Sequence, residues 1–237
     1  MPGLGVGLGE GLTLPDFITL GFFLFCWLAF DLVIDHSMLG FRSLSGLMAH
    51  KRREWMLTMA ARDLRMIDTA ILNGLQQGAA FFGSASILAI GGSFALLGAT
   101  DQVLQIYRDV QLSSALPRGL WETKVLGLMV IFVYAFFKFA WSYRLFNYCS
   151  ILIGAVPHRA EGNEAAMRKA ALKAADMNIN ASRHFTSGLR GIFFALAYLG
   201  WFIGPWFLAA STLFVVGVLT RRQYFSKSRQ ILVDDEG

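Results

Sequence analysis

The sequence is poor in charged residues and in cysteine. Only 16% of its residues are Asp, Glu, Lys or Arg, whereas soluble domains carry about 25%. The two cysteines, Cys26 and Cys149, both fall in apolar stretches, so we expect no disulfide framework. Because 55% of the residues are hydrophobic and the mean hydropathy is +0.51, we expect an integral membrane protein.

Motifs of enzymes and cofactor sites are missing as well. The sequence contains no GxSxG, no HExxH, no Walker loop and no GxGxxG that follows a strand. Its four histidines include no pair at i, i+4 spacing, so no metal or haem ligands are expected. We therefore expect no catalytic residues, no cofactor and no metal.

Four long apolar segments dominate the chain. They cover residues 14–35, 67–97, 124–150 and 191–220, and each is long enough to cross a bilayer of about 30 Å as a helix. The expected fold class is all-α, with four transmembrane helices in one domain over residues 1–237 and amphipathic cytoplasmic helices between them.

The last segment, 191–220, is long for one span and short for two. Pro205 follows Gly204 at its middle. We expect one kinked, tilted helix, and a short re-entrant hairpin is the alternative.

Two segments between the spans have apolar stripes at helical spacing. Residues 43–65 also carry the basic cluster Lys51, Arg52 and Arg53, so this helix either lies in the membrane interface or packs on the protein itself. Residues 158–187 are alanine-rich, and we expect them to form a helix that packs on another helix or on the membrane surface.

The distribution of basic residues predicts the orientation. Residues 36–66 and 144–190 hold most of them, and the N-terminal segment holds none. The positive-inside rule places both segments in the cytoplasm and the N-terminus outside. Four spans then leave the basic tail after residue 220 outside, whereas a hairpin brings it inside. Anionic lipid headgroups, and not nucleic acid, are the expected partner of the +5 net charge.

Polar residues inside the apolar segments are the candidate functional positions, because a charge there costs roughly 2.5–3.5 kcal/mol on insertion scales. In chain order they are Asp31, Asp35, Asn73, Gln77, Lys138, Arg144 and Asn147. We expect two ion pairs, Asp31 with Lys138 and Asp35 with Arg144, and an ion or proton pathway is the alternative interpretation.

Asn73 and Gln77 begin a stripe of polar and small residues. Ala80, Ser84 and Gly91 continue it at spacings of three, four or seven. Small residues let helices approach closely in lipid and amides bond across them, so a helix–helix seam is expected and a pore lining is the alternative.

Three long runs resemble one family of bacterial membrane proteins. They are HKRREWMLTMAARDLRMIDTAILNGLQQGAAFFGSASILAIGG, LWETKVLGLMVIFVYAFFKFAWSYRLFNYCSILIGAVP, and WFIGPW followed by RRQYFSKS. From about Phe17 to Ser228 the chain is similar to the family catalogued as domain of unknown function 599. The resemblance implies a multi-pass protein of the bacterial inner membrane, and it implies no activity and no catalytic residues.

Two classes of function remain open at this point. The first is a homo-oligomeric channel- or transporter-like assembly, with the second or third span lining a pathway. The second is an accessory or scaffold subunit that packs against another membrane complex. An enzyme acting on lipid is a third possibility with no motif behind it.

Overall fold

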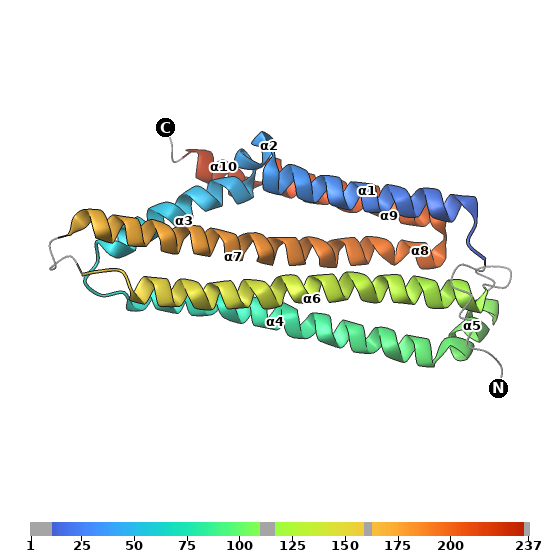
Figure 1. Cartoon of the computed structure of the whole chain (residues 1–237). Helices are drawn as coiled ribbons and strands as arrows, with labels where there is room; N and C mark the ends of the chain where they lie inside the picture. Colours follow the sequence, from blue (N-terminus) through green and yellow to red (C-terminus); the bar gives the residue numbers. More distant parts are fainter. Residues whose placement is uncertain (1–10, 110–116, 159–162, 235–237) are drawn as a thin grey trace. The chain divides into compact units, whose positions relative to one another are not determined.

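The computed structural model describes residues 11–109, 117–158 and 163–234. Its helices, in chain order, are α1 (Leu14–His36), α2 (Met38–Phe41), α3 (Leu44–Ala60), α4 (Met66–Gly98), α5 (Thr100–Asp109), α6 (Arg118–Gly154), α7 (Glu164–Tyr198), α8 (Gly200–Ile203), α9 (Pro205–Tyr224) and α10 (Lys227–Asp234) (Figure 1). The described residues contain no strand. The all-α prediction is confirmed.

Four segments are long and apolar enough to cross a membrane. They are Leu14–Asp35, Met66–Gly98, Arg118–Gly154 and Glu164–Ile203. The first two coincide with expected spans, and the third begins earlier than expected, because residues 118–123 continue the helix that was predicted to start at Lys124. The protein is therefore an all-α membrane protein with four helices of spanning length.

The expectation of one kinked helix over 191–220 is wrong. The alanine-rich segment and the first part of this block form one continuous helix, α7, and α9 begins only at Pro205. The Ser211 hydroxyl donates to the Ala197 carbonyl at 2.6 Å. Residues fourteen apart in one helix would lie about 21 Å apart at the helical rise, so the chain reverses direction between them (Figure 1).

Backbone geometry explains the position of this reversal. Gly204 adopts an extended conformation with φ 169°, which ends the helix. Pro205 is then the first residue of α9, a position where its missing N–H costs nothing. At Gly200 an added Cβ would lie 2.5 Å from Ser211 Oγ and 2.7 Å from the Phe207 carbonyl oxygen, so the two limbs of the hairpin approach closely there.

The chain divides into two compact units. Unit 1 holds residues 1–30, 85–134 and 190–218, and unit 2 holds residues 31–84, 135–189 and 219–237. Each of α1, α4, α6, α7 and α9 begins in one unit and ends in the other.

Aromatic rings form much of the core of unit 1. Phe23 of α1 makes edge contacts with Trp27, Phe194 and Tyr198, with ring centroids 5.6–5.9 Å apart. Trp27 also stacks on Phe194 at 5.5 Å. Such pairs add about 0.5–1.5 kcal/mol each to the burial of their area, so they fix α1 against α7.

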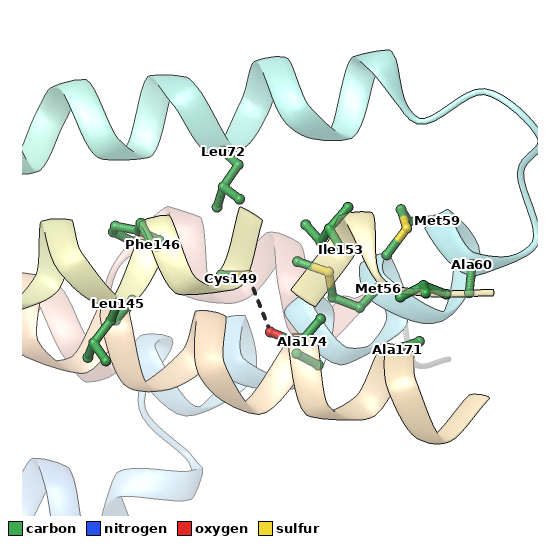
Figure 2. Packing of buried hydrophobic residues seen from close by; sticks show 13 residues of the cluster. Met56, Met59, Ala60, Leu72, Leu145, Phe146, Cys149, Ile153, Ala171 and Ala174 are labelled. Carbon is green, nitrogen blue, oxygen red and sulfur yellow. Dashed lines mark hydrogen bonds between the residues drawn. The ribbon is translucent and has the colours of Figure 1, made fainter. Parts of the chain in front are cut away.

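Unit 2 has a separate core of aliphatic and sulfur-containing side chains (Figure 2). Helix α3 contributes Met56 and Met59, which are both fully buried, and α4 contributes Leu72. Small residues of α7, among them Ala171 and Ala174, let that helix approach α6. The alanine-rich stripe of the sequence is therefore a helix-packing surface.

The structure also decides between the two interpretations of residues 43–65. Buried Met56, Met59 and Ala60 pack α3 on unit 2. Its polar side chains bind other side chains of the same unit, since Arg53 pairs with Asp176 at 3.0 Å and Lys51 pairs with Glu54 at 3.2 Å. Helix α3 is thus packed on its own protein.

Candidate functional site

Ionisable side chains from three helices of unit 2 interact electrostatically. His184 of α7 interacts electrostatically with Lys138 of α6 and with Asp35 near the end of α1. We call these three residues the His184 cluster. Lys138 and Asp35 were expected to be functional, whereas His184 was not, because its segment was assigned to a helix outside the spans.

The His184 cluster is only partly buried. The side chains of His184, Lys138 and Asp35 are all partly exposed. The Nδ1 atom of His184 is buried and has no hydrogen-bond partner within the described part of the chain. An imidazole nitrogen accepts or donates one hydrogen bond, so this atom is a buried polar group that the described side chains do not satisfy.

A second polar cluster lies in unit 1, and the sequence analysis missed it. The Trp201 indole N–H donates to Asp16 Oδ1 at 2.7 Å. Lys124 Nζ donates to the Trp201 carbonyl at 2.7 Å and lies 5.2 Å from the centre of the Trp201 ring. We call these three residues the Trp201 cluster.

The Trp201 cluster is buried, and the oxygens of its carboxylate are hydrogen-bonded. Asp16, Lys124 and Trp201 are only 4%, 3% and 1% exposed. The second oxygen of Asp16 accepts from the backbone N–H and the hydroxyl of Thr13, at 3.0 and 2.6 Å. Asp16 also attracts Lys124 electrostatically. Every carboxylate oxygen thus has a partner, as a buried charge requires, and the cluster joins α1, α6 and α8.

Four of the predicted site residues lie on the outside of the chain. Asn73 and Gln77 of α4 and Arg144 and Asn147 of α6 are exposed. The rest of the α4 stripe, Ala80, Ser84 and Gly91, is exposed as well. Within one chain the stripe is therefore not a helix–helix seam, and it faces lipid, solvent or a second molecule.

Arg144 contacts its own helix. Its Nε donates to the Tyr148 hydroxyl at 2.6 Å, and its guanidinium carbon lies 5.4 Å from the centre of that ring. The predicted pairs of Asp31 with Lys138 and of Asp35 with Arg144 stay predictions.

Arg65 has a structural role. Its guanidinium donates to the carbonyls of Ile153, Val156 and Pro157 at 3.3, 2.6 and 2.9 Å. These carbonyls lie at and beyond the end of α6, where helical partners are lacking. Arg65 therefore caps α6 by joining it to the turn that precedes α4.

A buried polar network also links α3, α6 and α7. Arg52 donates to the Asn178 amide oxygen, and the Asn178 amide donates to Cys149 Sγ at 3.6 Å. Burial lowers the pKa of the Arg52 guanidinium, and the neighbouring Cys149 thiol partly opposes this shift. The Cys149 thiol donates in turn to the Ala174 carbonyl at 3.4 Å (Figure 2). This network satisfies polar groups inside the unit 2 core.

Arg190 of α7 is a further charge that the sequence analysis did not single out. It is only 2% exposed, and Ser187, one turn earlier, is 4% exposed. A buried arginine within a spanning helix is costly unless the surrounding structure compensates it. Among the described residues, no group of three metal-ligating side chains is found.

Helices of spanning length with ionisable residues on their inner faces define a multi-pass α-helical membrane protein. The chain belongs to the family described as protein of unknown function, DUF599, whose model matches residues 18–228. No curated protein and no solved structure matches the chain.

Proposed function

We propose that this membrane protein works as a homo-oligomeric channel- or transporter-like assembly, and that the His184 cluster lies on its polar pathway. The observation that carries the proposal is the buried Nδ1 atom of His184 in α7, which is unpartnered among the described residues, together with the electrostatic interaction of His184 with Lys138 of α6 and Asp35 of α1. An ionisable residue inside a membrane helix is by default a candidate for an ion or proton pathway.

The candidate span of α1 supports a position of the cluster near one membrane surface. This span ends at Asp35, and a span of 22 residues suffices to cross a hydrocarbon core of roughly 30 Å. The His184 cluster would then lie at one boundary of the hydrocarbon, where a pathway opens to water.

The exposed stripe of α4 supports the homo-oligomer. Asn73 and Gln77 are exposed on the outside of the chain, and small residues follow them along the same helix. Amides and small residues favour contact between transmembrane helices. A second copy of the chain is the partner that such a stripe fits.

The hairpin supports a definite orientation in the bacterial inner membrane. We propose that α9 is a fifth crossing, since its 20 residues suffice for a bilayer. The basic tail then lies on the same side as residues 36–66, because both belong to unit 2. The positive-inside rule makes this side cytoplasmic and the N-terminus periplasmic.

The test combines particle mass with flux. Native mass spectrometry of the detergent-purified protein gives the number of copies, and proteoliposomes with an internal pH dye report proton flux under an imposed pH gradient. Separate assays with Na⁺ and K⁺ gradients cover the commonest cations. Lys138→Ala and His184→Asn are the probes, and His50→Asn is the matched control, because His50 is exposed and pairs with Glu54 on α3.

The proposal predicts an oligomer whose flux falls at least about tenfold in both probe variants and is unchanged in the control. A monomer without flux would contradict it. A particle that purifies with a larger complex would contradict it too, and would instead support the accessory or scaffold function.

A further inference from the structure

Three apolar side chains of α2 and of the chain after α9 are exposed. Leu39 and Phe41 of α2 are 58% and 75% exposed, and Phe225, which follows α9, is 74% exposed. Transfer of such side chains from water to an apolar phase is favourable, so this part of unit 2 gains free energy where it meets an apolar environment.

Hydrogen bonds hold the segments together. The Tyr224 hydroxyl donates to the Leu39 carbonyl at 3.4 Å, and Arg229 Nε donates to the Arg42 carbonyl at 2.9 Å. The Gln223 amide oxygen accepts from the backbone N–H and the hydroxyl of Ser45 at 3.3 and 3.2 Å. These contacts make α2, the end of α9 and α10 one surface, which we call the α2–α10 surface.

Three cations flank the apolar side chains. Arg42, Arg221 and Lys227 are exposed, and none of them forms an ion pair with a described carboxylate. The cations of α3 differ from them, since Arg53 already pairs with Asp176. The α2–α10 surface therefore combines protruding apolar groups with available positive charge.

We propose that the α2–α10 surface binds anionic phospholipid headgroups in the membrane leaflet where α1 ends. The candidate span of α1 reaches Asp35, so α2 begins within a few residues of the bilayer surface. Phenylalanine and leucine at this depth enter the boundary of the acyl chains. Arginine and lysine then reach the phosphates, and an anionic leaflet attracts them. The proposal does not depend on the channel-like function.

Native mass spectrometry of the full-length protein in detergent tests the selectivity. The protein is titrated with phosphatidylglycerol or with phosphatidylcholine of the same acyl chains. The probe is the triple variant Arg42→Gln, Arg221→Gln, Lys227→Gln. The matched control is Arg168→Gln, Lys169→Gln, Lys173→Gln, which removes the same charge from exposed positions of α7.

The wild type and the control should prefer phosphatidylglycerol, and the triple variant should bind it at least about fivefold more weakly, because each cation near an anionic surface is worth about fivefold in affinity. Equal losses in both variants would mean a response to net charge alone and would overturn the proposal. So would unchanged binding in the triple variant.

A depth measurement keeps the proposal testable if the triple variant does not fold. Phe41→Cys is made in a background with Cys26→Ala and Cys149→Ala, and the new cysteine is labelled with a nitroxide. In liposomes, the collision rates of the nitroxide with oxygen and with a water-soluble nickel complex report its depth in the membrane. The proposal expects a position at the headgroup–acyl boundary. A label fully accessible to the nickel complex would overturn it.

Discussion

The two polar clusters each contain an aspartate, a lysine and a ring N–H or nitrogen, but they differ in burial and in how completely their polar atoms are hydrogen-bonded. In the Trp201 cluster both oxygens of Asp16 accept hydrogen bonds, and Lys124 donates to a backbone carbonyl. In the His184 cluster the side chains are partly exposed, and one imidazole nitrogen is buried without a partner.

This difference separates a structural role from a functional one. Buried charges that are held by hydrogen bonds fix helices in place, and removal of one charge leaves its neighbours uncompensated. Charges that are only partly buried are the ones that our proposal places on a water-filled pathway, where protons can be taken up and released. We therefore expect substitutions in unit 1 to change stability, and substitutions in the His184 cluster to change activity.

The largest effect on stability is expected from Lys124→Ala. This change leaves the buried Asp16 carboxylate without its neighbouring cation and the Trp201 carbonyl without its donor, and removing one charge from such a buried group costs about 3 kcal/mol. Chemical unfolding in detergent, followed by circular dichroism, measures it. Lys173→Ala on the exposed face of α7 serves as the control and should change little. Equal stability of Lys124→Ala and the wild type would show that the Trp201 cluster does not hold unit 1 together.

An intermediate effect is expected from Gly188→Ala in unit 2. The added Cβ would lie 2.8 Å from the Phe139 ring, and such overpacking costs about 1–3 kcal/mol. Gly83→Ala is a matched control, because its Cβ would meet the same phenylalanine at an ordinary 3.7 Å. The same unfolding assay should separate the two variants, and indistinguishable curves would argue against the close packing of α6 on α7.

The smallest effect on stability is expected from His184→Asn. The buried Nδ1 atom of the imidazole has no hydrogen-bond partner within the described residues, so the free energy of unfolding should change by less than about 1 kcal/mol, while proton flux falls at least about tenfold. A loss as large as that of Lys124→Ala would place the His184 cluster among the structural contacts.

The sequence predicted the helices far better than their connections. Long apolar runs define α1, α4 and α6, because a bilayer demands about 20 such residues. The continuity of α7 was missed, since its polar, alanine-rich half and its apolar half differ in composition although no proline separates them. The hairpin at Gly204 was only an alternative, because a Gly-Pro pair permits both a kink and a reversal.

The clusters depend on contacts that no local pattern contains. Asp16 and Trp201 are 185 residues apart in the chain, and each is unremarkable in its own segment. Lys138 and Asp35 were recognisable as charges in apolar helices, whereas their neighbour His184 lies in a polar stretch of α7. Only the packing of the helices shows the hydrogen bond between Asp16 and Trp201 and the electrostatic interaction of His184 with Lys138 and Asp35.

The most direct test of the contrast between the clusters is the accessibility of two positions in intact membranes. His184→Cys and Val125→Cys are made separately in a background with Cys26→Ala and Cys149→Ala, and each is treated with a small, water-soluble thiol reagent. Val125 is fully buried in unit 1. We predict rapid modification at position 184 and none at position 125. Equal protection of both positions would contradict a solvated His184 cluster and, with it, a pathway through this site.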